Sequence, residues 1–108
     1  LQALQRNTPV DPLDDPGQAD LTAHVDFEAL ARAAAPAKHT RLTPQGVFLK
    51  RLGITARAEA LARKLDGAAL NAHVAAHRRL THPDEMGNLF KVLGLYPARA
   101  APPPGLTP

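Results

Sequence analysis

One dense apolar run near the end of the chain constrains the fold most strongly. Residues 89–95 read Leu-Phe-Lys-Val-Leu-Gly-Leu, and no other stretch is as rich in large apolar side chains. A run of this length with Val and Phe favours a strand buried on both faces, which requires helices above and below it. Only residues 39–43 offer a second strand, and a weak one, because Leu42 is its single strong apolar residue although Thr40 and Thr43 suit a strand.

Two strands do not make a stable sheet in water without further partners. The sequence therefore predicts part of a larger domain, and the first residue, Leu1 in place of a methionine, agrees with that expectation. The length of 108 residues leaves room for one small domain at most, and alanine, which buries little area, supplies much of the apolar 44%. We expect an α/β fold, the C-terminal portion of an open sheet whose first strands and ligand crevice lie outside residues 1–108.

Helical spacing is clear in four segments of the chain. These segments are residues 27–35, 44–52, 55–65 and 68–80. Asp26 is placed to cap the first helix, and Pro36 ends it because the residue before a proline is disfavoured in a helix. Thr43 and Pro44 predict the start of the second helix as N-cap and first helical residue, and Gly53 predicts its end.

Proline marks the segments between and after these helices. Residues 7–17 contain three prolines and three aspartates, which predicts a long loop. Pro83 with the two acids after it predicts one further helical turn that ends before Gly87. The last stretch of the chain is Pro-rich, so we expect a disordered tail at 97–108 after a folded part at 1–96.

Charge is divided unevenly along the chain, whose formal net charge is +3. Residues 1–30 hold six acids and one arginine, a net −5, so residues 31–108 carry +8. The basic part has no Lys/Arg block and almost no aromatic side chains for base stacking, so solvated helix faces explain it better than nucleic-acid binding. The absence of cysteine excludes disulfides, thiolate zinc sites and cysteine nucleophiles. Because the apolar runs are too short for a membrane span, we expect neither membrane nor nucleic acid as a partner.

Three polar residues alternate along residues 20–27, which read Asp-Leu-Thr-Ala-His-Val-Asp-Phe. In an extended segment, Thr22, His24 and Asp26 would point to the same side. A histidine near a carboxylate can serve as an acid or base, or hold a polar substrate group. The spacing also allows, and on its own favours, a structural role in which Asp26 only caps the following helix and His24 only fixes the loop.

Two other features are candidates for a site. His73 and His77 are four residues apart on an expected helix, with His82 five residues further on, which is a spacing that metal sites use. Because no glutamate stands where a zinc protease needs its base, an amphipathic helix with half-exposed histidines is the better interpretation, and we expect no metal. Gln45 opens a helix beside a strand end, where open sheets bind ligands, although a surface role also explains it.

Three ordered blocks of the sequence carry a family resemblance. They are Asp20–Phe27, then Gln45-Gly46-Val47-Phe48-Leu49 with Leu52-Gly53-Ile54 and Arg57, then Met86-Gly87-Asn88-Leu89-Phe90-Lys91-Val92-Leu93. In this order and spacing, the chain resembles the C-terminal part of the MidA-like methyltransferases, an S-adenosylmethionine-dependent family with mitochondrial members that methylate protein arginine in respiratory complex I assembly. The resemblance runs from Leu1 to about Leu95. It departs from the family pattern at 36–44, where relatives usually carry glycines and a Gly-Pro.

The resemblance implies a Rossmann-like methyltransferase sheet whose Gly-rich loop lies upstream, so that S-adenosylmethionine is bound mainly by residues outside this chain. The chain alone is then expected to be inactive. Residues 20–27 would lie at the carboxyl end of the sheet, near the acceptor pocket. The implied catalytic residues are His24 and Asp26, and the substrate-binding candidates are Thr22 and Gln45.

The same resemblance implies a protein substrate, with a cytoplasmic location in bacteria and a mitochondrial one in eukaryotes. A second hypothesis stays open on the residues alone. It is a non-catalytic module that docks a partner protein through the acidic loop and the basic helices. An upstream strand followed by a Gly-rich turn would favour the enzyme, and the absence of both would favour the module.

Overall fold

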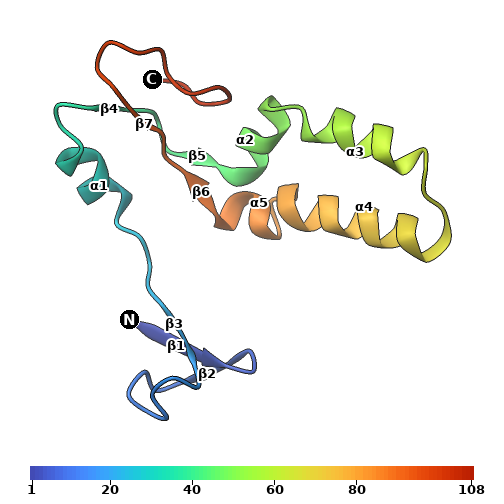
Figure 1. Cartoon of the computed structure of the whole chain (residues 1–108), viewed down its shortest axis with the longest axis horizontal. Helices are drawn as coiled ribbons and strands as arrows, with labels where there is room; N and C mark the ends of the chain where they lie inside the picture. The colour runs from blue at the N-terminus through green and yellow to red at the C-terminus, as the bar shows by residue number, and fades with distance from the viewer.

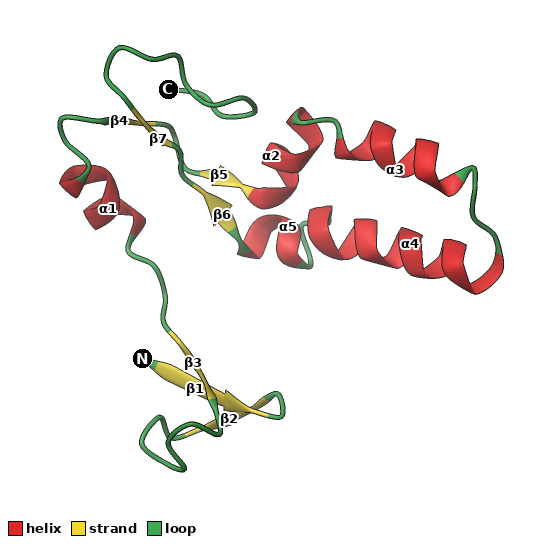
Figure 2. Cartoon of the chain, in the orientation of Figure 1, coloured by secondary structure: helices red, strands yellow, loops and turns green.

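The computed structural model describes all residues from Leu1 to Pro108 and shows a mixed α/β chain. In chain order its elements are β1 (Gln2–Gln5), β2 (Thr8–Val10), β3 (Asp20–Thr22), α1 (Phe27–Ala33), β4 (Lys38–His39), β5 (Thr43–Pro44), α2 (Gln45–Arg51), α3 (Ile54–Ala62), α4 (Gly67–Thr81), α5 (Met86–Leu89), β6 (Lys91–Val92) and β7 (Leu95–Tyr96). The N-terminal sheet lies at one end and the helices α2 to α5 at the other, with α1 and the remaining strands between them (Figures 1 and 2). The predicted mixture of helices and strands is confirmed.

Three antiparallel strands in the order β2-β1-β3 make the N-terminal sheet. Ala3 in the central strand pairs with Val10 on one side and with Leu21 on the other. Ala3 is also the single buried residue of this sheet. Backbone hydrogen bonds therefore hold these strands together with very little apolar core of their own.

The β1–β2 hairpin was missed by the sequence patterns. Arg6 and Asn7 both have positive φ angles, 49° and 61°, and form its two-residue turn. The prediction of a loop over 7–17 is therefore wrong for β2. Pro9 is compatible with β2 because this strand lies at the edge of the sheet, where a proline is tolerated.

Helix α1 begins and ends close to the predicted positions. The Ala29 N–H donates to Oδ1 of Asp26 at 2.9 Å, so Asp26 is the side-chain N-cap that the sequence predicts. The helix ends at Ala33, ahead of Pro36. None of its residues is buried, so α1 is held in this chain mainly by its own backbone and cap.

The two segments predicted as strands pair with each other, but through two separate short pairs of strands. β4 pairs with β7 and β5 pairs with β6, both antiparallel, with Thr43 opposite Val92. The prediction of one buried strand over 89–95 is wrong, because α5 takes in Leu89 and Gly94 separates β6 from β7. Leu89 is 75% exposed and Phe90 47%, so the start of the apolar run is not buried in this chain.

Residues 45–89, here called the helical arm, extend away from the paired strands as α2, α3, α4 and α5 (Figure 1). The start of α2 differs from its prediction, because Pro44 is the N-cap and the Thr43 hydroxyl donates to the Arg41 carbonyl at 3.2 Å. Gly53 ends this helix as predicted, with a left-handed φ of 89°. The turn predicted before Gly87 is wrong in position, since α5 contains that glycine.

Two glycines bring three helices of the arm together at the end of α4. A Cβ atom on Gly46 of α2 or on Gly87 of α5 would collide with the Thr81 carbonyl oxygen, and all three residues are buried. The hydroxyl of Thr81 donates to the His77 carbonyl at 2.8 Å, which satisfies the buried side chain. Only glycine lets the backbones of α2 and α5 approach this carbonyl so closely.

The segment 97–108, expected to be disordered, follows a defined path over the paired strands (Figure 1). Leu106 is buried, and its Cδ1 atom lies next to Gly94. The N–H of Arg41 donates to the Thr107 carbonyl at 2.8 Å. Thr40, only 1% exposed, accepts from the Gly94 N–H at 2.9 Å through its hydroxyl. The boundary between 1–96 and 97–108 stays a prediction.

The chain does not close around a core of its own. Its radius of gyration is 18.0 Å, whereas a compact domain of this length has about 13 Å. Nine of the 108 residues are buried, and three of these are threonines. No helix combines the length and apolar character that crossing a membrane requires.

Candidate functional site

The three polar residues predicted to share one face lie on the segment that joins β3 to α1. Thr22 ends β3, where it pairs with Gln2 of β1. His24 lies in the connection that follows, outside any strand, and Asp26 caps α1. Of the three residues, only Thr22 lies within a strand.

Every residue from Asp20 to Asp26 is exposed. The His24 side chain makes no hydrogen bond or ion pair within the chain, so its imidazole is free to meet a ligand or another protein segment. Asp26 differs, because one of its carboxylate oxygens accepts the Ala29 N–H at 2.9 Å. A carboxylate has further acceptor positions, so this cap and a contact to an incoming cationic group are compatible.

Gln45 is separate from these residues. It begins α2 in the helical arm, on the far side of the paired strands from α1 (Figure 1). Its side-chain Nε2 donates to the Leu80 carbonyl at 3.0 Å, near the end of α4. This hydrogen bond lies one residue from the Thr81 carbonyl that Gly46 contacts, so Gln45 helps to fix α2 on α4.

The histidines of α4 have structural surroundings. The His73 imidazole lies 2.8 Å from the Ala58 carbonyl through Nε2, which ties α4 to α3. Nε2 of His77 is buried without a hydrogen-bond partner, while Nδ1 of His82 accepts the Asp84 N–H at 3.1 Å. No group of three or more His, Cys, Asp or Glu side chains is arranged to hold a metal ion.

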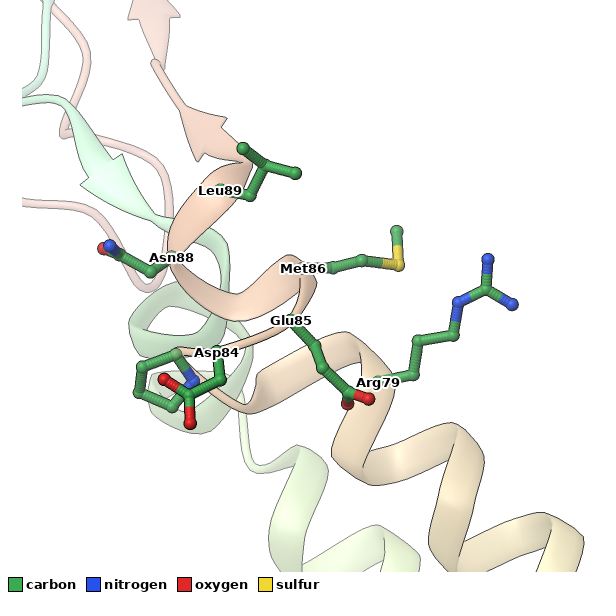
Figure 3. Close-up of a pocket in the computed structure, with 7 residues that line it drawn as sticks. Arg79, Asp84, Glu85, Met86, Asn88 and Leu89 are labelled. Carbon is green, nitrogen blue, oxygen red and sulfur yellow. The ribbon is translucent and has the colours of Figure 1, made fainter. Parts of the chain in front are cut away.

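One hollow lies at the junction of α4 and α5, and the sequence does not predict it. It has a volume of about 510 Å³, and seven residues line it, namely Arg79, Pro83, Asp84, Glu85, Met86, Asn88 and Leu89 (Figure 3). None of the predicted site residues is among them. Because these residues come from the end of α4, the following turn and α5, no local motif signals the hollow.

The glycines of this chain do not form a cradle for S-adenosylmethionine. A Gly-rich loop binds such a cofactor by bringing backbone N–H groups close to it. Here Gly46 and Gly87 contact the Thr81 carbonyl, and Gly94 contacts Thr40 and Leu106. The close approaches at Gly46, Gly87 and Gly94 are therefore used for packing within the chain, and these three residues do not fit the cofactor.

Comparison with known proteins connects these elements to one family. Residues 1–46 match the model of a family described as "Putative S-adenosyl-L-methionine-dependent methyltransferase". This range includes the whole block Asp20–Phe27 and the start of the second block, Gln45-Gly46.

Similar proteins extend the likeness beyond that range. The mitochondrial protein arginine methyltransferase NDUFAF7 of Xenopus laevis is 39% identical over 90 residues, which cover 81% of this chain and 20% of the relative. The human protein of the same name is 38% identical over 90 residues, with the same coverage. Its Drosophila melanogaster homologue is 33% identical over 100 residues, or 90% of this chain and 23% of the relative.

The chain thus spans about a fifth of the length of these relatives while most of its own residues align with them. The resemblance of this chain to the C-terminal part of the S-adenosylmethionine-dependent MidA-like methyltransferases is confirmed.

Proposed function

We propose that residues 1–108 are the C-terminal part of an S-adenosylmethionine-dependent methyltransferase that methylates arginine in a protein substrate. The observation that carries the proposal is the similarity of 81% of this chain to proteins named as arginine methyltransferases. A mitochondrial location follows for eukaryotic relatives from the same names. We propose that the cofactor is bound mainly by residues outside this chain, which agrees with the use of Gly46, Gly87 and Gly94 for packing here.

The open architecture of the chain supports this proposal. The paired strands β4–β7 and β5–β6 form a ribbon only two strands wide. Unpaired strand edges and exposed apolar side chains such as Leu89, Phe90 and Leu95 are costly for a chain that folds alone. Both features are accounted for if the ribbon forms the margin of a Rossmann-like sheet built mostly by other residues of the protein.

His24 and Asp26 are the residues of this chain that we assign to the reaction. Methyl transfer requires the acceptor nitrogen to be aligned with the methyl group and to lose a proton. The free imidazole of His24 is suited to accept that proton. Asp26 is suited to attract the guanidinium while it caps α1, and Thr22 to orient the connection between them.

The enzyme assignment is tested by calorimetry on the full-length protein that carries this chain. We expect S-adenosylhomocysteine to bind with one site per chain, and radioactivity from methyl-labelled S-adenosylmethionine to be incorporated into protein arginine. A full-length protein that neither binds S-adenosylhomocysteine nor transfers methyl groups would contradict the proposal. That result would leave the non-catalytic docking module as the function of the chain.

The role of His24 is tested separately by His24→Ala in the same full-length protein. We expect turnover to fall about 100-fold, the range of a lost acid–base group, with an unchanged melting temperature. His82→Ala on the helical arm is the matched control, because it removes an imidazole far from α1 and should leave turnover intact. Normal turnover in His24→Ala would remove this residue from the mechanism without affecting the enzyme assignment.

A further inference from the structure

An apolar groove runs along the helical arm, between α3 and α4 and onward over α4 to α5. It consists of two hollows, of about 180 and 520 Å³. Ala76 and Leu80 line both hollows, so the two lie side by side along α4. Ile54 and Leu61 of α3 line one end, and Met86 of α5 lines the other.

Large apolar side chains in this groove are open to solvent. Leu61 is 43% exposed and Leu80 is 38% exposed. The arm extends away from the paired strands, and neither the N-terminal sheet nor the C-terminal segment reaches this face of it (Figure 1). An apolar surface of this kind on an extended element is typical of a protein contact.

Two arginines border the groove without a partner. Arg57 lines the hollow between α3 and α4, and Arg79 lines the hollow over α4. Neither forms an ion pair, whereas the neighbouring Arg78 lies 3.9 Å from Glu85. Arg79 and Met86 point to the same side of the chain (Figure 3). The groove therefore combines an apolar floor with two guanidinium groups that form no ion pair within this chain, although Asp84 and Glu85 line an adjoining hollow with Arg79.

The dimensions suit one helix. α4 contains 15 residues, which corresponds to a length of about 22 Å, or roughly four helical turns. Alanines at 72, 75 and 76 stand on this face of α4, and their short side chains permit a second helix to approach closely. A helix laid along α4 would bring its own apolar face over Leu80 and its flanks next to the arginines.

We propose that this groove binds an amphipathic helix of a partner protein, with apolar residues on its inner face and carboxylates along its flanks. A second copy of the same groove is disfavoured, because it would place Arg57 and Arg79 against the same arginines. Nucleic acid is disfavoured, because the floor is apolar and only two cations face it. The proposal goes beyond methyl transfer and does not rest on it, since it uses only the shape and charge of the helical arm.

The test uses two synthetic amphipathic peptides of about 14 residues, the length that fits α4. Both carry leucine at helical spacing, and one has glutamate on its flanks while the other has lysine at the same positions. Binding to the full-length protein is measured by fluorescence anisotropy. We expect the glutamate peptide to bind about tenfold more tightly than the lysine peptide, because only the first complements the arginines.

Variants locate the binding on the arm. Arg79→Glu should weaken the glutamate peptide about tenfold and strengthen the lysine peptide. Arg63→Glu is the matched control, because it makes the same change of charge at the C-cap of α3, a position that lines neither hollow. It should change either affinity less than twofold. Circular dichroism melting of each variant verifies that the arm stays folded.

Four outcomes would overturn the proposal. They are equal affinities for the two peptides, equal losses in Arg79→Glu and Arg63→Glu, displacement of the glutamate peptide by duplex DNA, and a dimer mass in light scattering that the glutamate peptide disrupts. A fifth concerns the full-length protein itself. If amides of α4 that face the groove are protected from hydrogen exchange without peptide and are unaffected by its addition, another part of the same protein covers the groove.

Discussion

The helical arm and the first 30 residues are ordered in different ways. In the arm, three helices meet at the buried Thr81, and a Cβ atom on either neighbouring glycine would overlap its carbonyl. In the first 30 residues, Ala3 alone is buried, and order depends on strand hydrogen bonds and one helix cap. Close packing within this chain thus determines the shape of the arm, whereas the N-terminal part has almost no such packing.

The three family blocks differ in the same way. Gly46 and Gly87 belong to the second and third blocks, and their identity follows from the close helix packing at α4. Residues 20–26 of the first block are all exposed, so packing inside this chain explains none of them. Residues without a packing role in this chain are available for chemistry or for contact with the rest of a larger protein. We propose the first of these roles for His24.

The largest effect is expected at the glycine junction. Gly87→Ala should destabilise the arm by about 3 kcal/mol, because the new Cβ overlaps backbone oxygens of Thr81 and His82 that have no room to shift. Hydrogen exchange of the amides in α2 and α5 measures this loss locally in the full-length protein. Asn88→Ala, on the adjacent exposed position, should leave the exchange rates unchanged. Equal rates in both variants would show that the junction is looser than this structure indicates.

The C-terminal segment should show the next largest effect. Leu106→Ala removes a buried side chain that lies against Gly94, and we expect a loss of about 2 kcal/mol. Proteolysis after residue 96 should then become faster. Leu13→Ala is the control, because Leu13 is exposed in the N-terminal loop. A segment that is cleaved rapidly in the unaltered protein would support the disordered tail predicted from composition instead.

The sequence predicts interactions between neighbouring residues better than contacts between residues that are far apart in the chain. Asp26 caps α1 and Gly53 ends α2 as predicted. Both features are local, because an aspartate oxygen accepts a free N–H at the start of a helix and glycine tolerates a left-handed conformation at its end. The Arg6–Asn7 turn is equally local, but neither residue is a glycine, and the positive φ angles leave no clear mark in the sequence.

Contacts between distant residues were not predictable. The approach of Gly46 to Thr81 and that of Thr40 to Gly94 join residues far apart in the chain, and nothing in either local pattern specifies its partner. The apolar run at 89–95 predicts one strand only if it is buried, and periodicity alone does not separate a short helix from a strand. Gln45 was a candidate for substrate binding, and its hydrogen bond to the Leu80 carbonyl is visible only in three dimensions.

The cap of α1 tests how locally the N-terminal part is ordered. Asp26→Ala should destabilise α1 by about 1 kcal/mol, whereas Asp26→Ser should retain most of the stability because a serine hydroxyl accepts the same Ala29 N–H. Exchange of the Ala29 amide measures the difference. If both variants behave like the unaltered protein, contacts outside this chain hold α1, and the cap is incidental.

The smallest effect is expected from the exposed ion pair between Glu28 and Arg32, one turn apart on α1. Glu28→Gln should cost about 0.3 kcal/mol at low salt and nearly nothing at high salt, because solvent and ions screen a pair at this exposure. Glu28 also lies in the first turn, where a negative charge interacts with the helix dipole. A double-mutant cycle with Arg32→Gln separates the two contributions, since only the pair produces a coupling energy. A coupling above about 1 kcal/mol would exceed what exposed pairs provide. It would mean that α1 is shielded from solvent in the full-length protein, and that the first 30 residues are packed as closely there as the helical arm is here.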